Sequence, residues 1–471
     1  MRCRYEDVKS VTRAESSETD GGKGTILSMD QATEQALREV EERGVRFVRL
    51  WFTDVLGFLK SFAIPTAELE KAFREGVGFD GSAVEGFARV EEADMLARPD
   101  PTTFRVLPWP RSDEPVARIM CDVLHPDGSP FEGDPRWVLR RALARAEQSG
   151  YRLEAAPEVE FFLSSSDREF IPLDAGGYFD LTTADPAEEF RRRVTSALEA
   201  LDVRLEMYHH EDAPSQHEID LAPEDGMATA DNVIGLRLAA KEVAQELGLH
   251  ATFMPKPAAS IQGSGMHTHF RLMEAGSDRS ALYDPAGEAG LSKVGRAFVA
   301  GLLTHARGVT AVTNQWVNSY KRLVPGFEAP VYVCWGRRNR SALVRVPGDR
   351  PDDERACRIE YRALDPACNP YLAFAVLLAA GLDGISEGLD PPGEASDNIY
   401  ALSDDERRAE GIASLPASLE EALREMSRDE VVAEALGEHV FEWFLRNKLQ
   451  EWEEYRARVH PFEVERYFPL L

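Results

Sequence analysis

Residues 253–270 read FMPKPAASIQGSGMHTHF, which joins a rigid Pro-Lys-Pro segment, a Gly-Ser-Gly loop and two histidines. The prolines fix their own φ angles and favour extended geometry in the residue before each. The glycines let the backbone approach a ligand closely or take a positive φ. His267 and His269 are two residues apart, so on a strand both imidazoles point to one face. The stretch predicts a site for a metal and an anion; the alternative is a strand end with two half-buried histidines.

The composition is ordinary for a globular chain, with 29% charged and 43% hydrophobic residues. Its 471 residues exceed what one core usually holds, so two domains are expected. The net charge of −28 disfavours nucleic acid or an acidic membrane surface as a partner. It suits cationic small molecules or divalent metals, although a solvated acidic surface is the commoner cause of such a charge.

Cysteine usage and apolar runs indicate a cytoplasmic protein. Five cysteines are scattered without a C-x-x-C pair, which argues for reduced thiols and against a disulfide frame or a zinc site. The longest apolar run, 371–382, is too short to cross a bilayer, and the N-terminus lacks the apolar core of a signal peptide. Residues 1–27 are polar and are expected to be a disordered extension, or to reflect an upstream start.

Helix and strand signals alternate after position 27. Ser28 and Gln31 form a capping-box pattern that begins a helix, and Gly44 ends it. The other expected elements are strands over 45–52, 59–64 and 116–123, a turn at Asp54 and Gly57, and a glycine-rich loop over 76–87. This mixture predicts a small α+β domain over residues 28–126.

A second domain is expected over residues 133–471. Asp134 is an N-cap followed by Pro135 at the first helical position, and Gly150 ends that helix. Further helices are expected over 187–201, 230–247 and 291–312, and the last hundred residues, especially 419–459, are expected to be mainly helical.

Two glutamates share a face in the segment APEVEFF, residues 156–162. On a strand, Glu158 and Glu160 point to the same side, where bare carboxylates repel each other unless a cation lies between them. The alternative, a solvated strand face, is weakened by the apolar residues that follow. The pair therefore favours metal ligation.

The segment HHEDAPSQHEID, residues 209–220, contains a second pair of glutamates. Pro214 breaks any helix, so Glu211 and Glu218 are expected on either side of a bend, where they could meet over one metal. A charged surface loop is the alternative for this segment.

The segment RIEYR, residues 358–362, puts Glu360 between two arginines on one strand face. It is either an ion-pair ladder or a metal ligand beside two clamps for an anion. Further residues of this kind are Arg322, Glu328 after a Pro-Gly hinge, Arg340 and Arg345. Five carboxylates and a histidine suit Mg²⁺ or Mn²⁺ better than zinc. With several arginines, the set indicates metal-assisted phosphoryl transfer, and no P-loop motif is present.

With these motifs the chain resembles the glutamine synthetase family, of the bacterial class I type. The similarity runs from about residue 30 to the C-terminus. Eight motifs occur in the family's order: FTD at 52–54, GFDGS at 78–82, PEVEFF at 157–162, HHE to QHEID at 209–220, PKP to GSGMHTH at 255–269, NSYKRLVPGFEAP at 318–330, NRSALVRVP at 339–347 and RIEYR to NPYL at 358–372.

The resemblance implies an N-terminal β-grasp domain followed by an α/β catalytic domain, in a homododecamer of two stacked six-membered rings. Each active site would lie between neighbouring subunits. By position, one metal would be held by Glu160, Glu211 and Glu218, and the second by Glu158, His267 and Glu360. Glutamate would meet Gly263, Arg322, Glu328, Arg340 and Arg362. ATP would meet Glu206, His269, Arg340, Arg345 and Arg355. The amine pocket would contain Tyr178, Glu211, Glu328 and the next subunit's Asp54.

The resemblance also implies a mechanism in which Asp54, Glu328 and Arg340 are the catalytic residues. Two or more Mg²⁺ or Mn²⁺ ions and the arginines would neutralise the phosphates of ATP, so that the γ-carboxylate of glutamate attacks and forms γ-glutamyl phosphate. Asp54 would then deprotonate the incoming ammonium or amine, which displaces phosphate. Glu328 would shield the acyl phosphate from water.

Several positions depart from the family's pattern. Gln262 replaces the usual Asn, Ser215 the usual Gly, Arg271 a frequent Ser and Arg355 a frequent Lys. The sequence NIYALSDDE around Tyr400 lacks the context of the adenylylated subclass, so control by adenylylation is not expected. The chain is similar in this respect to actinobacterial paralogues of the family.

Three functions remain open from the sequence. The first is a ligase that joins glutamate to ammonia, favoured by Asp54 and Glu328. The second joins glutamate to a larger amine, such as a polyamine or ethanolamine, and the changes at Ser215, Gln262 and Arg271 favour it. The third is a non-catalytic scaffold, which the presence of all six expected metal ligands disfavours.

Overall fold

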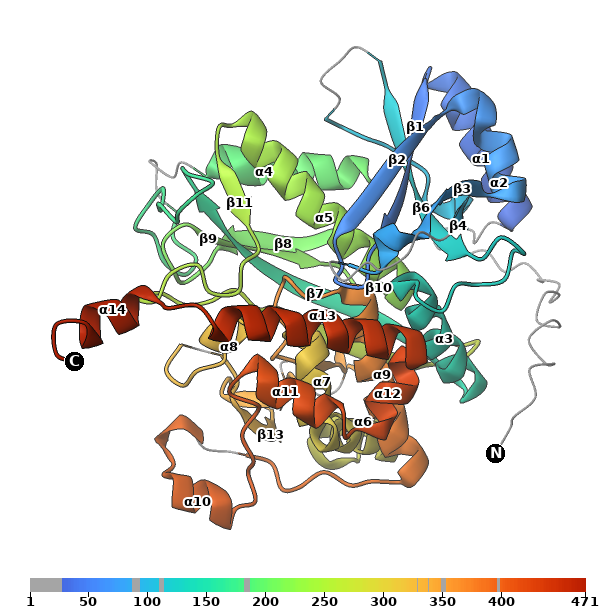
Figure 1. Ribbon diagram of the computed structural model, residues 1–471. Coiled ribbons are helices and arrows are strands. Elements are labelled where there is room, and N and C mark those ends of the chain that lie inside the picture. The colour runs from blue at the N-terminus through green and yellow to red at the C-terminus, as the bar shows by residue number, and fades with distance from the viewer. Residues whose placement is uncertain are drawn as a thin grey trace.

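The computed structural model describes residues 28–86, 94–109, 114–181, 187–327, 329–337, 339–348, 353–395 and 399–471. The expected extension over 1–27 lies outside these residues, as does Glu328. Two units, each built on its own sheet, pack side by side (Figure 1).

The N-terminal unit is a six-stranded sheet of order β2-β1-β6-β4-β3, with β5 paired to β6. Its elements are α1 (Met29–Glu42), β1 (Phe47–Thr53), β2 (Leu59–Pro65), α2 (Leu69–Glu75), β3 (Val77–Asp80), β4 (Asp94–Pro99), β5 (Arg105–Val106) and β6 (Val116–Leu124). The predicted capping box is present at Ser28 and Gln31, and the predicted hairpin pairs β1 with β2. Strand β1 also pairs in parallel with β6, which places both in the centre of the sheet.

The prediction of a loop over residues 76–87 was wrong in its first half. Gly76 ends α2 with φ +75°, and the chain then enters β3, where Val77 pairs with Ala97 of β4. Phe79 packs on Phe52 with ring centroids 4.8 Å apart. The aromatic contact and the ladder therefore outweigh the low strand propensity of the glycines. Phe87 lies outside the described residues.

The second unit is a nine-stranded sheet of order β13-β14-β15-β12-β7-β9-β8, with β10 and β11 also paired to β7. Its strands are β7 (Tyr151–Ser164), β8 (Leu205–His210), β9 (Gln216–Leu221), β10 (Glu224–Asp225), β11 (His250–Thr252), β12 (Met266–Glu274), β13 (Tyr332–Gly336), β14 (Ala342–Arg345) and β15 (Ile359–Tyr361). Strand β7 pairs along its length with β9, β10, β11 and β12.

Helices cover this sheet and form most of the C-terminal third (Figure 1). They are α3 (Pro135–Gln148), α4 (Glu188–Ala200), α5 (Gly226–Glu246), α6 (Lys293–Thr304), α7 (Ala306–Thr313), α8 (Ser319–Arg322), α9 (Pro370–Glu387), α10 (Asp404–Ala409), α11 (Leu419–Met426), α12 (Glu430–Leu436), α13 (Glu438–Arg456) and α14 (Pro461–Tyr467). The helix predicted to begin at Pro135 and end at Gly150 is confirmed, as are the helices predicted over 187–201, 230–247, 291–312 and 419–459. The helix over 291–312 is divided into α6 and α7, and that over 419–459 into α11, α12 and α13.

Helix α9 is the core helix of the second unit. It is the helix among the described residues that is long and apolar enough to cross a membrane, but 78% of it is buried inside the protein. Gly384 of α9 faces Gly301 of α6 so closely that a Cβ on Gly384 would lie 2.2 Å from a carbonyl oxygen of α6. The burial of α9 therefore accounts for its all-round apolar sequence.

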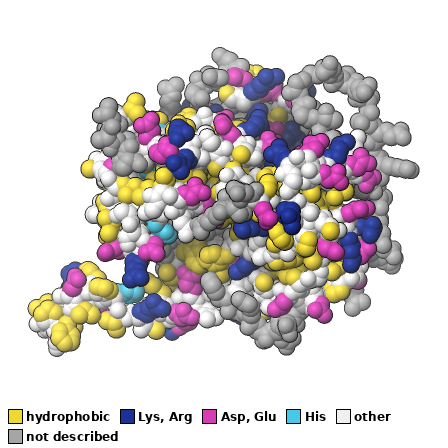
Figure 2. Space-filling model, turned by 90° about the horizontal axis from the view of Figure 1, so that it is seen from above, with side chains coloured by type: hydrophobic (Ala, Val, Ile, Leu, Met, Phe, Trp, Pro, Cys, Tyr) yellow, Lys and Arg dark blue, Asp and Glu magenta, His cyan; other side chains and the backbone are white. Residues whose placement is uncertain are grey.

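Helix α14 projects away from the rest of the chain at the C-terminus (Figures 1 and 2). Hydrophobic side chains gather on this arm, where Phe468 is 85% and Leu470 79% exposed. Contiguous exposed apolar side chains of this kind are typical of surfaces that contact a partner.

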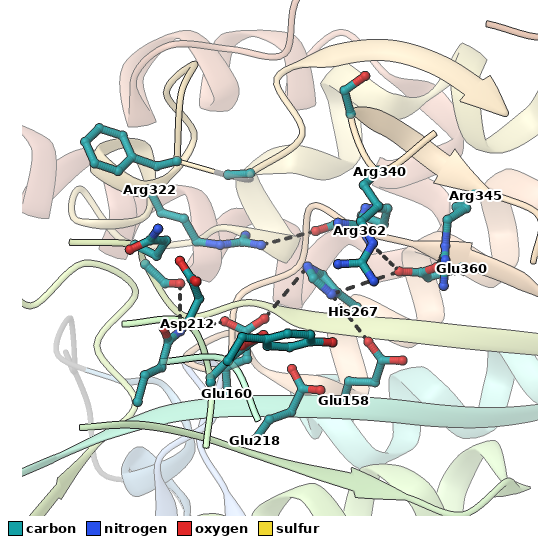
Figure 3. Close-up of a pocket in the computed structure, with 18 of the residues that line it drawn as sticks. Glu158, Glu160, Asp212, Glu218, His267, Arg322, Arg340, Arg345, Glu360 and Arg362 are labelled. Atoms are coloured by element: carbon teal, nitrogen blue, oxygen red, sulfur yellow. Dashed lines mark hydrogen bonds and ion pairs between the residues drawn. The ribbon is translucent and has the colours of Figure 1, made fainter. Parts of the chain in front are cut away.

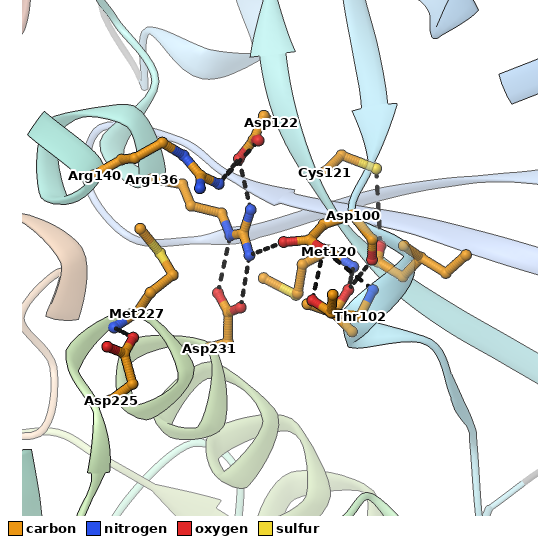
Figure 4. A network of polar contacts seen from close by, with 12 residues as sticks. Asp100, Thr102, Met120, Cys121, Asp122, Arg136, Arg140, Asp225, Met227 and Asp231 are labelled. Carbon is orange, nitrogen blue, oxygen red and sulfur yellow. Dashed lines mark hydrogen bonds and ion pairs between the residues drawn. The ribbon is translucent and has the colours of Figure 1, made fainter. Parts of the chain in front are cut away.

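A buried guanidinium ties the two units together (Figure 4). Arg136 of α3 reaches Asp122 of β6 at 2.6 Å, Asp100 at 2.8 Å and Asp231 of α5 at 3.0 Å. The hydroxyl of Tyr371 donates to Asp231 at 2.7 Å. Removing one partner from such a buried network typically costs about 3–5 kcal/mol, because the remaining charges stay buried. The orientation of the N-terminal sheet on the larger unit is therefore fixed by charge as well as by apolar packing.

His305, between α6 and α7, is held by two carboxylates. Its Nδ1 lies 2.9 Å from Asp429 and its Nε2 3.0 Å from Asp383. Burial alone would lower the pKa of His305, but the hydrogen bonds to Asp429 and Asp383 outweigh it and raise the pKa above the usual value. The charged ring therefore stabilises the folded state.

We expect His305→Gln to make the stability less dependent on pH. A raised folded pKa gives stability that is complete below the unfolded pKa of about 6.5 and is lost as pH rises through the folded pKa. The Tm of the wild type should exceed that of the variant by about 2–4 °C near pH 6, and the difference should shrink above pH 8. Thermal unfolding followed across this pH range measures it.

His125→Gln is the matched control, because His125 makes a more exposed contact, with Glu132 at 2.9 Å. It should leave the pH profile close to that of the wild type. A constant difference between His305→Gln and the wild type from pH 6 to 8 would contradict the charged state of His305.

Candidate active site

A cavity of about 660 Å³ opens on the strand face of the second unit. Carboxylates rise from the strands on one side, and arginines face them from the other (Figure 3). Its lining includes Glu158, Glu160, Tyr178, Glu211, Glu218, Gly263, His267, Arg322, Arg340, Arg345, Glu360 and Arg362. Most of the residues that the family resemblance implies therefore meet in one place, although they come from segments that are distant in the sequence.

The first group of possible metal ligands is Glu160, Glu211 and Glu218, whose oxygens lie within 4.8 Å of one another. Glu160 on β7 is the direct cross-strand partner of Glu218 on β9. Glu211 follows β8, where its backbone N–H donates to the Gln216 carbonyl at 2.8 Å. The predicted meeting of Glu211 and Glu218 across the bend at Pro214 is thus observed.

The second group is Glu158, His267 and Glu360, whose ligand atoms also lie within 4.8 Å of one another. His267 on β12 is the cross-strand partner of Glu158, and its Nδ1 lies 3.4 Å from Glu158 Oε2. The two glutamates predicted to share one face of a strand are therefore members of two adjacent groups. Oxygen donors with one imidazole suit a hard divalent cation.

Glu360 is fully buried between two arginines. Arg362 donates to its Oε1 at 2.6 Å, and Arg345, its cross-strand partner, donates to Oε2. Burial would raise the pKa of Glu360, but Arg362, His269 and Arg345 lower it to about 2. The ladder was expected to run through Arg358 and Arg362, but Arg345 takes the second place beside Glu360, and Arg358 donates to His269 instead. Glu360 is also a member of the second group of possible ligands.

Glu218, unlike Glu360, is surrounded by other carboxylates. Its pKa is held well above the usual range by burial and by the neighbouring carboxylates of Glu160, Asp220 and Glu158. The pKa of Asp220 is raised to about 7 by burial and by Glu158. A bound cation between these groups would relieve the repulsion, since an opposite charge favours the ionised carboxylate.

A third group was missed by sequence reasoning. His209, Glu218 and Asp220 also place ligand atoms within 4.8 Å of one another, and His209 Nε2 lies 3.1 Å from Glu218 Oε1. Asp220 is the cross-strand partner of Glu158. The signal was present, because Glu218 and Asp220 alternate on β9 as Glu158 and Glu160 do on β7.

Arg322 closes the other wall of the cavity. It is 2% exposed, and its guanidinium donates to the carbonyls of Ala363 at 2.7 Å and of Arg362 at 3.2 Å. A Cβ on Gly265 would lie 2.5 Å from Arg322 Nη2, and one on Gly263 would lie 2.4 Å from the carbonyl of Pro255. The glycine loop is therefore required for this close packing, which places the backbone of Gly263 at the cavity.

Three of the residues expected at ATP do not line the cavity. Glu206 and Arg355 are described and exposed, but neither lines this cavity. His269 is buried beside it and lies 2.7 Å from Glu158 Oε1, while Arg358 donates to its other ring nitrogen at 3.2 Å. Burial would raise the pKa of Glu158, but His267 and His269 hold it well below its usual range. In this chain His269 thus supports a carboxylate of the second group.

Asp54 lies apart from the cavity of its own chain, in the turn between β1 and β2. It is 1% exposed, and its Oδ1 accepts from the N–H groups of Leu56 and Phe58 at 3.0 and 2.9 Å. Lys60 lies 3.0 Å from Oδ2. Burial raises the pKa of Asp54, and Lys60 opposes that shift. Within one chain these contacts are those of a turn-capping residue.

The positions that depart from the family's pattern are spread over different environments. Gln262 lines the cavity, whereas Ser215 is fully buried beside it. Arg271 lies 3.1 Å from Glu154 on the neighbouring strand. Tyr400 lines the cavity, and its hydroxyl donates to the Ala329 carbonyl at 2.6 Å. Burial raises the pKa of Tyr400 to about 12.

Two family models match the chain. The model described as "Glutamine synthetase, beta-Grasp domain" matches residues 44–126, and "Glutamine synthetase, catalytic domain" matches residues 132–467. These matches confirm the predicted α+β class, with a β-grasp domain followed by a catalytic domain.

Curated relatives cover nearly the whole chain. The chain is 54% identical over 448 residues to a protein named glutamine synthetase from Mycolicibacterium smegmatis, covering 94% of this chain and 100% of that protein. It is 50% identical over 452 residues to one of the same name from Methanosarcina mazei, covering 95% and 100%. A solved structure described as "GmaS/ADP complex-Conformation 1" superimposes with a TM-score of 0.83 at 35% identity, covering 92% of this chain and 99% of that one.

These similarities span both units and include every strand that carries a residue of the cavity. The chain therefore belongs to the glutamine synthetase family.

Proposed function

We propose that this protein is an ATP-dependent ligase that joins the γ-carboxylate of glutamate to ammonia. The observation that carries the proposal is the pair of adjacent three-ligand groups facing Arg322, Arg340, Arg345 and Arg362 in one cavity. The relatives named glutamine synthetase support this reaction. The solved relative GmaS is a complex with ADP, which supports ATP as the phosphoryl donor here.

The donor set fits two divalent cations, Mg²⁺ or Mn²⁺, because it consists of carboxylate oxygens and one imidazole. Glu160, Glu211 and Glu218 would hold one ion, and Glu158, His267 and Glu360 the other. Bound there, the ions neutralise the phosphate oxygens of ATP. Repulsion among the carboxylates gives these groups a strong preference for a cation.

The four arginines that line the cavity, Arg322, Arg340, Arg345 and Arg362, serve the phosphoryl transfer. Arg340 and Arg345 line the cavity and would contact the transferred phosphate. The other residues proposed for ATP are His269, which is buried beside the cavity, and Glu206 and Arg355, which are exposed outside its lining. Arg322, Arg362 and the backbone of Gly263 hold glutamate, whose γ-carboxylate oxygen attacks the γ-phosphorus as ADP leaves. The product of this step is γ-glutamyl phosphate, an activated acyl group.

The second step takes place at the side of Tyr178 and Glu211. Ammonium enters there and loses a proton to Asp54 of a neighbouring subunit. The nitrogen attacks the acyl carbon, and phosphate leaves with the oxygen that came from glutamate. Glu328 shields the acyl phosphate from water in the meantime.

A larger acceptor amine is the alternative. Of the changes that favoured it, Gln262 lines the cavity, but Arg271 is engaged with Glu154 across β12 and β7. A non-catalytic scaffold is disfavoured, because all six expected ligands are brought together.

We also propose a homododecamer of two six-membered rings in the cytoplasm. The apolar arm at α14 supports an oligomer, since its side chains are exposed in the single chain. The described cysteines Cys121, Cys334, Cys357 and Cys368 are free thiols, which suits a reducing compartment. The proposed location of Asp54 in a neighbour's site requires such an assembly.

We expect divalent metal to raise the Tm of the wild type but not of Glu218→Gln. Binding at a hundredfold excess over Kd adds about 2.7 kcal/mol to the stability of a folded protein. Glu218 belongs to two of the ligand groups, so its amide removes one ligand and part of the repulsion. Thermal unfolding after EDTA treatment, with and without Mn²⁺, measures the increment.

Glu154→Gln is the control for this comparison. Glu154 lies on the same strand as Glu158 and Glu160 but is paired with Arg152 and Arg271 at 2.8 and 3.1 Å. It should keep the metal-dependent increment. A Glu218→Gln variant that kept the full increment would remove this residue from the ligand set.

Glu160→Gln should abolish turnover while the oligomer stays intact. The amide keeps the shape of the side chain but removes the charge that a divalent cation needs. Purified wild type should release phosphate from ATP when given glutamate and ammonium, and Glu154→Gln should do the same. Phosphate release and size-exclusion chromatography measure the two properties.

The same phosphate-release assay, repeated with a panel of amines, identifies the acceptor. Phosphate release with ethanolamine or a polyamine but not with ammonium would replace ammonia by a larger amine. Near-normal activity of Glu160→Gln at saturating Mg²⁺ would overturn the ligand assignment.

Asp54→Asn should keep nucleotide binding but slow amide formation by about 10²-fold or more, as expected for loss of a general base. The amide oxygen can still accept from Leu56 and Phe58, so the turn is preserved. Lys60→Met is the control, because it removes the ion pair and leaves the carboxylate. Rapid-quench measurement of amide formation separates this step from ATP binding.

Mixed rings of Asp54→Asn and Glu360→Gln subunits test the shared site. Some interfaces in such rings carry neither lesion, so part of the activity should return. Proven co-assembly without recovery would place Asp54 outside a neighbour's site, and equal rate losses in Asp54→Asn and Lys60→Met would reduce its role to the turn.

A further inference from the structure

Two residues with a strained backbone lie on the same side of the cavity: Phe179 lines it, and Ser215 is buried beside it. Among the residues that the structure describes, four non-glycine residues have a positive φ: Phe179, Asp202, Ser215 and Ala289. Phe179 has φ +59° and Ser215 φ +60°, in the left-handed region that an L side chain rarely adopts. Such residues persist where the surrounding contacts hold them, and they concentrate at functional sites.

Ser215 is fully buried, and each of its polar groups has a partner. Its Oγ accepts from the N–H groups of Leu173 at 2.5 Å and of Asp174 at 3.3 Å. Its N–H donates to Asp174 Oδ1 at 2.9 Å, and its carbonyl accepts from Leu163 of β7 at 2.9 Å. The serine thus joins the bend before β9 to the segment around residue 174.

Asp174 carries the connection to β8. Its Oδ1 also lies 3.0 Å from His210 Nε2 and accepts from the N–H of Gly176 at 3.0 Å. A Cβ on Gly176 would lie 2.8 Å from that ring, so the backbone passes directly over His210. The N–H of Phe179 then donates to the His210 carbonyl at 3.0 Å. The segment 173–179 is therefore fixed at both of its ends.

This segment presents two aromatic side chains to the cavity. Tyr178 is 45% and Phe179 56% exposed, and both line the cavity. The centroid of the Phe179 ring lies 4.2 Å from the Tyr178 centroid and 4.4 Å from the His209 centroid. We call Tyr178 and Phe179 the aromatic rim. Because its side chains are half exposed, the rim depends for its position on the hydrogen bonds of Ser215, Asp174 and His210, together with the hydrogen bond between Tyr178 and Arg340.

We propose that Ser215 is a positioning residue that sets the width of the amine side of the cavity through the aromatic rim. A rim held against His209 leaves space for ammonium and excludes larger primary amines. Ser215 itself does not line the cavity, so it acts through the segment 173–179. This inference rests on the proposed function, because it concerns which amine reaches the acyl phosphate.

The strained backbone at Ser215 is accounted for by the hydrogen-bond acceptor that serine supplies. A glycine at position 215 would adopt the same φ without cost but would leave the N–H groups of Leu173 and Asp174 without their acceptor. Serine accepts the strain and supplies that acceptor. Ser215 departs from the family's usual glycine in a way that favoured a larger amine from the sequence alone, but in this role it acts against one.

Ser215→Gly and Ser215→Ala test the proposal. Both should raise kcat/KM for methylamine and ethanolamine relative to ammonium by about tenfold, the discrimination that one or two methylene-sized groups provide. The KM values for ATP and glutamate should stay unchanged. Phe179→Ala should shift the ratio in the same direction. Ala289→Gly relieves the same backbone strain at a residue outside this cavity, and should leave the ratio unchanged.

Hydrogen exchange gives a readout that does not depend on turnover. In both Ser215 variants the amides of Leu173 and Asp174 should exchange at least about tenfold faster, while Gly265, whose N–H donates to Glu160 at 2.9 Å, should keep its protection. Unchanged exchange at Leu173 and Asp174, or an unchanged amine ratio in an active Ser215→Gly enzyme, would overturn the role of Ser215.

The two proposals fail in different ways. A wild type that forms no amide from ammonium, glutamate and ATP would overturn the proposed function, and the exchange experiment would still decide whether Ser215 holds the rim. An active wild type with unshifted amine ratios in Ser215→Gly, Ser215→Ala and Phe179→Ala would overturn the rim proposal alone.

Discussion

Repulsion between carboxylates held in register on neighbouring strands is the constraint on which the rest of the structure depends. Glu160 faces Glu218, and Glu158 faces Asp220, across the antiparallel pair of β7 and β9. Directly opposed side chains on one face lie about 4.5–5.5 Å apart, so like charges there destabilise the sheet. The fold offsets part of this cost with His267 and His269 on the far side of β7 and with Arg345 and Arg362 around Glu360. Burial and the neighbouring carboxylates raise the pKa of Glu218, which belongs to two of the three groups of possible ligands.

A sheet that carries this charge requires a rigid support. Strand β7 is paired on both sides, and the long apolar helix α9 forms the core behind the sheet, packed closely enough on α6 to require glycine at Gly301 and Gly384. Arg136 then fixes the N-terminal sheet through Asp100 and Asp122, so the hairpin that carries Asp54 has one orientation. A general base on a different unit, or in a different subunit, can act only if that orientation is maintained.

The sequence predicted which side chains share one face of a strand better than it predicted which residues oppose each other on neighbouring strands. Period-two alternation was sufficient to place Glu158 and Glu160 together, and Pro214 was sufficient to predict the bend between Glu211 and Glu218. Alternation carries no information about register, so the cross-strand position of Asp220 and the contact of His269 with Glu158 could not be derived from it. The strand β3 was missed because its stability comes from pairing with β4, which is distant in sequence. The family resemblance implied two groups of possible ligands, whose ligand atoms the structure places within 4.8 Å of one another, but the engagement of Glu360 by both Arg345 and Arg362 required the structure.

The two sides of the cavity differ in how they are built, and this difference has a consequence for specificity. The proposed metal ligands lie mainly on paired strands, with Glu211 in the bend after β8. A shift of one residue in strand register would move each strand-borne side chain to the other face. The amine side consists of the loop residues Tyr178 and Phe179, held by side-chain hydrogen bonds to Asp174 and Ser215. Loops tolerate substitution far better than the centre of a sheet. If the site works as proposed, a few loop contacts would be enough to change the acceptor amine while the phosphoryl-transfer chemistry stays fixed. In its proposed role, a single serine in a left-handed conformation would be a small enough change to carry such a difference, because it would set the position of two aromatic rings without being one of the six proposed ligands.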